Sequence, residues 1–467
     1  MSDARPIAGS FRDPAGHVFE VDGRIYRTVN HVAANAYETL RDNGVLSDMI
    51  DAGWLISATE VEHPLVSGAE SSARYVVEHP KLTFISHPYE WCFSALKRAA
   101  VFHLDFQLAL LERDAVLSDA SAYNVQFDGT RPYFIDFLSL RPYRDGEYWT
   151  GHRQFCEQFL NPLLIFAKLG IAPNAWYRGG LEGISTTDLV RILPWTKRLS
   201  WNAFSHVTLQ ASLQNKSISN DTGSAAKPQT GKKLSKTAYR GLLQQLRNWI
   251  AKLTLKQGEK TVWGDYADSH SYDSDEDLAK RRFVGEFVEA TKPDLLWDLG
   301  CNTGEYSSVA LSAGAGRVIG FDFDHGALNK AFARGSKEGL KFQALFLDAA
   351  NPSPDQGWQQ RERQGMAARA RADAILALAF EHHLAIGRNV PIDQTVSWLV
   401  GLAPHAVIEF VEKSDPTVQQ MLAFREDIFP DYSKENFANA LARHATIVKS
   451  EVVSASGRTL FWCTNNV

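Results

Sequence analysis

The chain has 467 residues, a length that predicts two or three domains. Its composition, 45% hydrophobic and 22% charged residues, is that of an ordinary globular protein. Its formal net charge of −5 argues against binding dominated by electrostatic attraction to nucleic acid or membranes. The scattered cysteines indicate neither a disulfide framework nor a zinc site, so no metal centre is predicted from them. A polar N-terminus and the absence of long apolar runs predict a cytoplasmic protein without membrane spans.

The N-terminal half begins with elements of an α+β domain. The resemblance to the kinase-like fold, carried by the residues described next, implies strands over Phe19–Thr28 and then a helix bearing Glu38. The same resemblance implies that Phe84–Tyr89 leads into a long helix, Trp91–Arg113. Beyond it, Val125–Phe127 and Tyr133–Ile135 are expected to be two short strands joined by an Asp-Gly turn.

Three polar residues surround these short strands in the segment LSDASAYNVQFDGTRPYFIDFLSL. Asp119 is followed five residues later by Asn124, and Asp136 closes the hairpin. The pattern resembles the catalytic segment of the kinase/aminoglycoside-phosphotransferase fold. The resemblance implies that Asp119 accepts the substrate proton and that Asn124 and Asp136 hold magnesium beside ATP.

The N-terminal half also departs from the kinase pattern. It has no glycine-rich phosphate loop, and Arg24 or Arg27 stands where a lysine is expected. Three alternatives therefore stay open: a phosphotransferase using ATP and magnesium, a degenerate module that binds substrate or nucleotide, and an α+β domain in which Asp119 and Asp136 are turn residues.

The segment 214–236 is rich in Ser, Lys, Asn and Gly and is predicted to be a flexible linker. It separates a kinase-like domain, 1–213, from a second domain, 237–467. An amphipathic helix with a basic face, containing Arg240 and Arg247, opens the second domain. The expectation is that this helix packs on its own domain, and binding to an anionic surface is the alternative.

Strands alternate with helices through the second domain, which predicts a parallel, doubly wound sheet of the Rossmann-like class. A pair of closing strands, Ala445–Val453 and Thr459–Cys463, is expected at the end of the chain. The buried strands predicted before them are Leu295–Leu299, Arg317–Phe321, Phe342–Leu347, Ala374–Phe380 and Ala406–Val411.

The most specific motif is LLWDLGCNTGEYS, Leu295–Ser307, in which Asp298 ends a strand and Gly300 and Gly304 precede a helix. Glycines are needed where the backbone turns tightly or approaches a ligand. The motif resembles the D-x-G-x-x-x-G loop of class I S-adenosylmethionine methyltransferases. The resemblance assigns S-adenosylmethionine binding to the residues Asp298, Gly300, Cys301, Asn302 and Gly304.

Two more strand ends extend this resemblance. Asp322 lies eighteen residues beyond Gly304, where the superfamily places an acidic residue that accepts hydrogen bonds from the ribose hydroxyls. Asp348 and Ala349 end the third strand, where such enzymes hold adenine. The segment 263–272 precedes the domain's first helix, and Tyr266, His270 and Tyr272 are expected to fold over the cofactor as a lid.

The catalytic face is expected at the end of the fourth strand, in ALAFEHHLAIGRNVP. Glu381, His382 and His383 form a polar cluster there, and either histidine is a candidate base for the acceptor proton. The alternative is that a histidine caps a helix or lies satisfied in the core. Arg388 and Asn389 are expected either to bind a polar acceptor or to lie in a solvated loop.

Nearly the whole chain resembles a bacterial family named after the rhizobial host-specific nodulation protein NoeA. The segments that carry the resemblance are FRDPAGHVFEVDGRIYRTVN, SHPYEWCFSALKRAA, LSDASAYNVQF, DLGCNTGEYS, ALAFEHHLAIGRNVP and EDIFPDY. It implies a methyltransferase-like protein tied to host-specific nodulation or cell-surface saccharide modification, and it does not fix the acceptor. The leading hypothesis is methyl transfer to an oxygen or nitrogen of a small or saccharide-type acceptor, in nodulation-signal or surface-glycan modification. The alternatives are a bifunctional phosphotransferase–methyltransferase and a binding module; nucleic acid is the weaker acceptor.

Overall fold

The protein is described from a computed structural model that covers residues 5–62, 73–198, 233–255, 274–369, 371–423 and 425–465. Most of the predicted linker, 214–232, and the predicted lid residues Tyr266, His270 and Tyr272 lie outside these ranges. The chain forms two compact units. The first comprises residues 1–127, 132–259 and 354–368, and the second comprises 128–131, 260–353 and 369–467.

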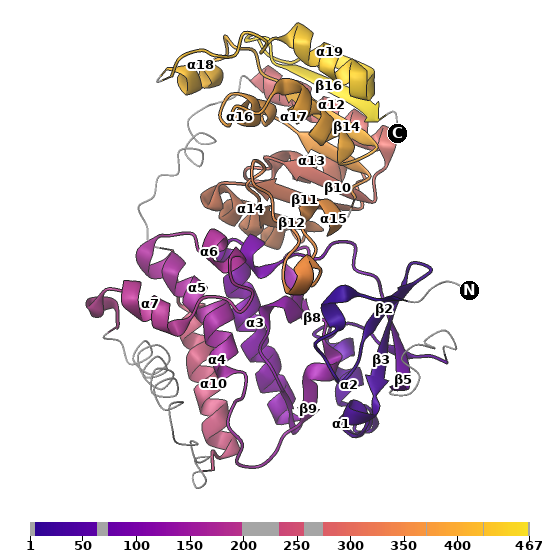
Figure 1. Cartoon of the computed structure of the whole chain (residues 1–467), viewed down its shortest axis with the longest axis vertical. Coiled ribbons are helices and arrows are strands. Elements are labelled where there is room, and N and C mark those ends of the chain that lie inside the picture. Colours follow the sequence, from indigo (N-terminus) through magenta and orange to yellow (C-terminus); the bar gives the residue numbers. More distant parts are fainter. Residues whose placement is uncertain are drawn as a thin grey trace. The chain divides into compact units, whose positions relative to one another are not determined.

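The first unit contains a five-stranded antiparallel sheet with the order β1-β2-β3-β5-β4 (Figure 1). Its strands are β1 (Arg5–Pro6), β2 (Val18–Val21), β3 (Arg24–Asn30), β4 (Thr59–Glu60) and β5 (Ala73–His79). The helices α1 (His31–Asp42) and α2 (Val45–Asp51) follow β3. The predicted early strands and the helix bearing Glu38 are thereby confirmed.

A long helix, α3 (Phe93–Glu112), is the core of the rest of the first unit. It is apolar on most faces, and Leu96, Leu104, Phe106 and Leu110 are fully or almost fully buried, as expected for a helix surrounded by protein. Two short strand pairs follow it: β6 (Ala115–Leu117) with β9 (Leu140–Pro142), and β7 (Val125–Asp128) with β8 (Arg131–Phe134). The predicted hairpin is therefore confirmed. The described α-helices that follow include α4 (His152–Phe155), α5 (Asn161–Leu164), α6 (Asn174–Arg178) and α7 (Thr186–Ile192), and π-helical segments, Cys156–Leu160 and Ile165–Leu169, follow α4 and α5.

The amphipathic helix α10 (Lys236–Ala251) belongs to the first unit rather than opening the second. Its apolar side packs along α3, and the Arg247 guanidinium donates to both carboxylate oxygens of Asp105 at 2.8 and 3.0 Å. The side chains that α10 buries are Tyr239, Leu243, Leu246 and Ile250. The sequence pattern predicted the buried face of α10 correctly. It assigned α10 to the second domain, however, because α3, the helix on which α10 packs, lies more than 100 residues earlier in the chain.

The second unit is built on a seven-stranded sheet with the order β12-β11-β10-β13-β14-β16-β15 (Figure 1). The first five strands of that order are parallel, and β16 is antiparallel to both β14 and β15. The strands are β10 (Leu295–Leu299), β11 (Arg317–Asp322), β12 (Phe342–Phe346), β13 (Ala374–Ala377), β14 (His405–Phe410), β15 (Ala445–Val452) and β16 (Thr459–Asn465). The predicted parallel sheet and closing strand pair are confirmed.

Helices connect these strands and cover the sheet. They are α12 (Ser274–Thr291), α13 (Glu305–Ser312), α14 (His325–Glu338), α16 (Glu381–Ala385), α17 (Ile392–Gly401), α18 (Pro416–Leu422) and α19 (Lys434–His444); α15 (Met366–Arg369) lies where the chain passes between the units. The strand order reverses at β10, which has β11 on one side and β13 on the other. In open parallel sheets, ligands bind at the carboxyl ends of the strands beside this switch point.

Candidate active site

The loop between β10 and α13 turns at the switch point with two glycines in the left-handed region. Gly300 has φ +77° and Gly304 has φ +79°, and side-chain-bearing residues rarely adopt such angles. A Cβ atom on Gly300 would lie 3.1 Å from the Phe380 ring, and one on Gly304 would lie 3.1 Å from the Phe342 ring. Both positions therefore require glycine for conformation and for space.

Backbone hydrogen bonds hold this loop against the neighbouring strand. The amides of Gly300 and Cys301 both donate to the carbonyl oxygen of Phe321, at 2.8 and 3.0 Å. Asp298 lies beneath the loop with 2% of its surface exposed and accepts a 2.6 Å hydrogen bond from the Ser307 hydroxyl. Burial raises the pKa of Asp298 to about 7. Asp298 thus fixes the start of α13 from within the core.

Asp322, the predicted ribose ligand, ends β11 directly beside the glycine loop. Its carboxylate accepts from the amide of Asn302 at 2.8 Å and from the amide of Asp324 at 2.8 Å. Burial raises the pKa of Asp322 to about 6, although the backbone donors oppose the shift. The carboxylate is oriented by the backbone and keeps lone pairs for further donors.

Asn302 supplies a test of whether a ligand fits here. Its side-chain oxygen is buried and has no hydrogen-bond partner among the described residues. A buried, unpaired acceptor carries a free-energy cost unless a donor reaches it. A ligand with an ammonium group and ribose hydroxyls, as S-adenosylmethionine has, would offer donors to Asn302 and Asp322, so the residues present fit this cofactor.

Asp348 and Ala349 follow β12 at the same edge of the sheet, as predicted. The Asp348 carboxylate accepts from the amide of Ala350 at 3.1 Å, and the guanidinium of Arg388 lies 3.8 Å from it. Arg388 comes from the loop that follows α16. The predicted adenine position and the predicted acceptor loop are thus brought together by this ion pair.

Phe323 is a candidate that the sequence pattern did not single out. It follows Asp322 directly, and its side chain is 57% exposed. Its ring lies 5.5 Å, centroid to centroid, from Phe346, which in turn stacks on His325 at 4.7 Å. An exposed ring beside the Asp322 carboxylate offers a flat apolar surface. The segment GFDFD could have indicated it, since the aromatic residue stands immediately after the acid.

The predicted catalytic residues Glu381, His382 and His383 lie where β13 ends and α16 begins. Glu381 is fully buried and His382 is 1% exposed, whereas His383 keeps part of its surface accessible. The two imidazole rings lie 4.2 Å apart, centroid to centroid. Burial lowers the pKa of His382 well below its usual value and that of His383 to about 4, so both rings are neutral at pH 7.

Glu381 is held by a short hydrogen bond from Tyr432. The Tyr432 hydroxyl oxygen lies 2.6 Å from the Glu381 carboxyl, to which it donates, and 2.8 Å from the carbonyl oxygen of Val411. The amide of Val411 donates to the same Glu381 oxygen at 3.3 Å. Burial raises the pKa of Glu381 to about 8, which agrees with a neutral carboxyl group.

A buried ionic network supports this corner of the site. Glu409 is fully buried in β14 and accepts from the amide of Ala379 at 2.9 Å. Its other oxygen lies 2.8 Å from the Lys280 ammonium and 3.7 Å from the Arg458 guanidinium. Ala379 has φ +47°, an unusual angle for alanine, and this turn ends β13 at Ala377, three residues before the predicted end at Phe380. The fourth strand is therefore shorter than expected because Glu409 binds the turn that follows it.

In the first unit, the three predicted polar residues are brought together. The Asn124 amide nitrogen lies 3.3 Å from carboxylate oxygens of both Asp119 and Asp136. Burial, with a smaller contribution from Asp136, raises the pKa of Asp119 to about 6. The Ser139 hydroxyl also donates to Asp136 at 2.5 Å. Among the described residues, no group of three or more His, Cys, Asp or Glu side chains is arranged to hold a metal ion.

Arg27 of β3 shapes the electrostatics of that cluster. Its guanidinium is 2.6 Å from Asp136 and 2.7 Å from Asp13, and it lies 5.4 Å from the centroid of the Phe137 ring. Of the two arginines predicted to replace a lysine here, Arg27 is the one that reaches Asp136, because Arg24 pairs with Glu78. Asp136 is thus already bound to a fixed cation.

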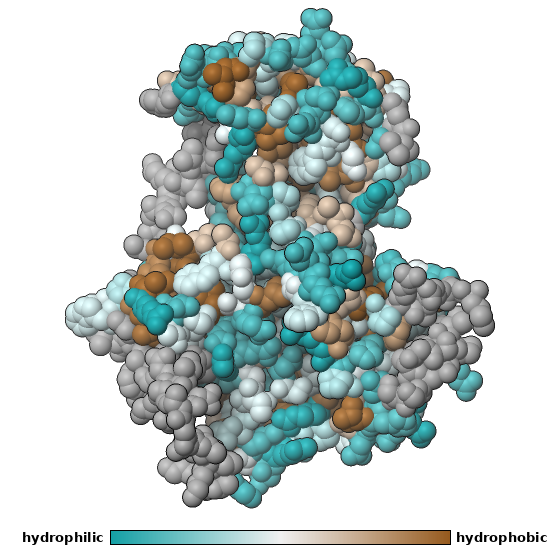
Figure 2. Space-filling view, viewed as in Figure 1, coloured by the Kyte–Doolittle hydropathy of each residue, from teal (hydrophilic) through white to brown (hydrophobic). Residues whose placement is uncertain are grey.

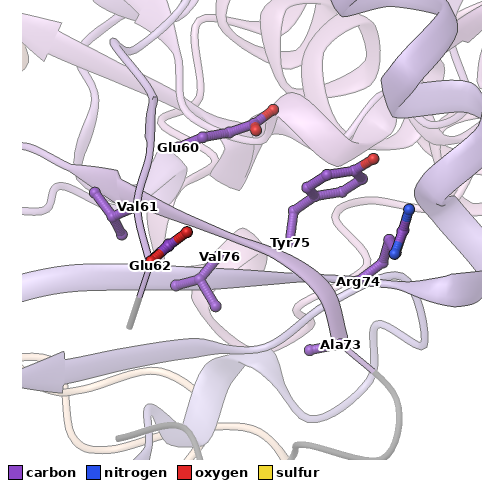
Figure 3. Close-up of a pocket in the computed structure, with 7 residues that line it drawn as sticks. All are labelled: Glu60, Val61, Glu62, Ala73, Arg74, Tyr75 and Val76. Carbon is purple, nitrogen blue, oxygen red and sulfur yellow. The ribbon is translucent and has the colours of Figure 1, made fainter. Parts of the chain in front are cut away.

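A pocket of about 500 Å³ lies elsewhere in the first unit, between β4 and β5 (Figure 3). Glu60, Glu62, Arg74 and Tyr75 contribute to its lining, and none of the predicted site residues does. Residues 63–72 between its two walls lie outside the described ranges. The chemistry of the glycine loop and its carboxylates, rather than this hollow, marks the candidate active site.

The chain is 47% identical over 458 residues to the nodulation protein NoeA of Rhizobium meliloti strain 1021. The alignment covers 97% of this chain and 95% of that protein. The chain belongs to the NoeA family. The predicted family resemblance is thereby confirmed, while no family model matches the sequence.

Several solved methyltransferase structures resemble part of this NoeA-family chain. The N-methyltransferase NodS of Bradyrhizobium japonicum WM9, in complex with S-adenosyl-L-homocysteine, matches 44% of this chain and 97% of its own (13% identity, TM-score 0.32). The magnesium protoporphyrin IX methyltransferase ChlM of Synechocystis PCC 6803 matches 43% and 91% (18% identity, TM-score 0.30). WbdD matches 43% of this chain and 42% of its own (18% identity, TM-score 0.30). These superpositions are weak, and the candidate site rests on its own contacts.

The surface gives no sign of a dominant apolar face in the view of Figure 2, where hydrophobic residues occur in small groups among hydrophilic ones. Among the described helices, none combines the length and the apolar character needed to cross a membrane.

Proposed function

We propose that this NoeA-family protein transfers a methyl group from S-adenosylmethionine to an oxygen or nitrogen of a small, saccharide-type acceptor. The observation that carries the proposal is the switch-point edge of the second unit. There the left-handed glycine loop, the oriented carboxylate of Asp322 and the exposed ring of Phe323 lie together beside β10. In open parallel sheets, ligands bind at this edge beside the switch point.

Each part of this edge has a distinct task in the proposal. The loop Gly300–Gly304 allows close approach of the backbone, with Cys301 and Asn302 inside it. Asp322 accepts from the ribose hydroxyls, Phe323 covers the base, and Asp348 with Ala349 contacts the adenine edge. Bound S-adenosylmethionine supplies a methyl group on a positively charged sulfur. The protein residues then position the acceptor in line, which supplies much of the rate.

His383 is our candidate for the base that removes the acceptor proton. It is the histidine of the pair that keeps accessible surface, and its ring is neutral at pH 7 and so able to accept a proton. His382 lies behind it, and neither of its ring nitrogens has a hydrogen-bond partner among the described residues. Because unpaired buried nitrogens are costly, we propose that His382 contacts the bound reactants or a water held by them. A neutral, buried Glu381 orients this turn through Tyr432.

Family membership supports the proposed acceptor class. The NoeA relative is named a nodulation protein, and we propose that the acceptor is a component of a nodulation signal or of a surface glycan. The four cysteines are buried and form no disulfide, which fits a protein that acts in the reducing cytoplasm.

The direct test of transfer uses S-adenosylmethionine with a radiolabelled methyl group and a panel of neutral and amino-sugar oligosaccharides. Label should move to at least one acceptor with the wild type. His383→Ala should bind S-adenosylmethionine as tightly as the wild type but lose transfer by about 100-fold or more, the range expected for a general base. Full transfer by both His382→Ala and His383→Ala would reject the assignment of the base.

The second candidate function concerns the first unit, for which we propose a kinase-like fold that serves as a binding module. The gathering of Asp119, Asn124 and Asp136 supports the fold. The pairing of Asp136 with Arg27 argues for the degenerate form, since magnesium would have to displace a guanidinium held at 2.6 Å. Calorimetric titration with ATP and magnesium tests this. Magnesium-dependent binding that Asp136→Ala abolishes would instead favour the bifunctional phosphotransferase–methyltransferase.

A further inference from the structure

The segment Pro354–Ala368 departs from the β12–β13 connection of the second unit and is part of the first unit. Residues on both sides of it belong to the second unit. In Figure 1 it is the orange segment that lies against indigo and purple elements of the first unit. Connections within α/β units are usually short, so an excursion of this length calls for a reason.

The segment is a closed loop with its own internal structure. Gln356 and Arg363 pair as in an antiparallel ladder, with backbone hydrogen bonds of 2.8 and 3.0 Å in the two directions. The Glu362 carboxylate accepts from the amide of Trp358 at 3.1 Å. A loop closed in this way holds its contact residues in a fixed arrangement.

An ion pair joins the loop to the N-terminal segment of the first unit. The Arg12 guanidinium reaches both oxygens of Glu362, at 2.8 and 3.0 Å. The Glu362 side chain is only 6% exposed. Gly9 lies so near that a Cβ atom there would come within 2.8 Å of the Glu362 carbonyl oxygen. A bidentate contact between a guanidinium and a buried carboxylate is geometrically more specific than an ion pair between two exposed side chains.

A second contact lies next to the polar cluster of the first unit. The Arg363 guanidinium stands 4.7 Å above the centroid of the Tyr123 ring, a distance typical of cation–π attraction. Tyr123 immediately precedes Asn124. Its side chain is buried, so Arg363 covers a ring that has little other access to solvent.

Two hydrogen bonds to the backbone complete the attachment. His87, between β5 and α3, has its Nε2 atom 3.0 Å from the carbonyl oxygen of Gln364. The Gln356 side chain donates to the carbonyl oxygen of Arg178, at the end of α6, at 2.7 Å. The loop therefore contacts four parts of the first unit that are far apart in the sequence.

We propose that the contacts of this loop restrict the connection that carries Asp348 and Ala349, so that Glu362 and Arg363 are positioning residues for S-adenosylmethionine. The inference rests on the proposed function. Only residues 350–353 separate Asp348 and Ala349 from the segment Pro354–Ala368. Fixing one end of so short a connection restricts the conformations open to it, and this lowers the entropy lost when the cofactor orders it.

The test uses the full-length protein and the double variant Glu362→Ala, Arg363→Ala. We expect the dissociation constant for S-adenosylmethionine, measured by calorimetry, to rise about tenfold, a size typical of coupling between sites. Limited proteolysis should cut the segment 354–368 faster than in the wild type. Arg363→Lys, which keeps a cation above Tyr123, should recover much of the affinity when combined with the native Glu362.

Arg361→Ala is the matched control, because this exposed arginine of the same loop has no side-chain hydrogen bond or ion pair among the described residues. It should bind S-adenosylmethionine like the wild type. Wild-type affinity in the double variant, whether or not cleavage has accelerated, would overturn the inference. An equal loss of S-adenosylmethionine affinity in Arg361→Ala, or no recovery of affinity with Arg363→Lys, would also overturn the inference. Either result would show that the loop has only a general structural role. Absence of binding by the wild type itself would instead reject the proposed function, and the inference with it.

Discussion

Removing the Glu409 carboxylate should destabilise the second unit more than any change at its surface. Glu409→Ala deprives the buried Lys280 ammonium of a partner at 2.8 Å and the amide of Ala379 of its acceptor at 2.9 Å. Breaking a buried ion pair costs about 3–5 kcal/mol, and an unsatisfied buried amide costs about 1–3 kcal/mol. Lys280 keeps Glu276 at 2.9 Å, and Arg458 keeps Asp415, so we take the lower part of these ranges, about 4 kcal/mol in all.

For a unit of this size, each kcal/mol shifts the unfolding temperature by about 2–4 °C, so a fall of about 8–16 °C is expected. Differential scanning calorimetry of the full-length protein measures it. The double variant Lys280→Met, Glu409→Leu removes both charges and should recover part of the loss, because an apolar pair of similar volume can replace a buried ion pair. A fall of less than about 3 °C in Glu409→Ala, or a double variant less stable than the single one, would refute the reasoning.

Three further predictions concern the loop, the base and the first unit. Gly304→Ala forces a Cβ atom against the Phe342 ring at φ +79° and should weaken S-adenosylmethionine binding at least tenfold in calorimetry, whereas Gly285→Ala, with open space around it, should not. If His383 is the base, kcat/KM should fall only below about pH 5. The pKa of His383 is lowered to about 4, so its ring stays neutral and able to accept a proton down to about pH 5. A pH profile with its midpoint at 6.5 would contradict the assignment. Arg27→Ala leaves a carboxylate without its guanidinium and should lower the stability of the first unit by about 3 kcal/mol in urea unfolding; an unchanged midpoint would show that the pair contributes nothing.

Local patterns were sufficient to predict much of the second unit. The apolar runs predicted β10 and β11, and the spacing of Gly300 and Gly304 predicted the loop, because buried parallel strands and left-handed turns leave direct marks in the sequence. The end of β13 was predicted three residues late. The residue that ends it, Glu409, lies 30 positions later, so no local pattern reports the contact.

Long-range partners account for the other differences. The buried side of α10 was evident from its period, but α3, on which it packs, is not encoded nearby. No pattern in the sequence predicted that Pro354–Ala368 belongs to the first unit. Ion pairs such as that of Arg12 with Glu362 join positions 350 residues apart, and local patterns do not report them. The gathering of Asp119, Asn124 and Asp136 was expected from their resemblance to the kinase-like catalytic segment, whereas the pairing of Arg27 with Asp136 needed the structure.

Calorimetric titration of the purified protein with S-adenosylmethionine tests the central claim most directly, with Asp322→Ala as the paired variant. The account predicts binding by the wild type and a loss of at least tenfold in the variant, because the Asp322 carboxylate is the oriented acceptor beside the glycine loop. No binding by the wild type, or equal binding by both proteins, would contradict it.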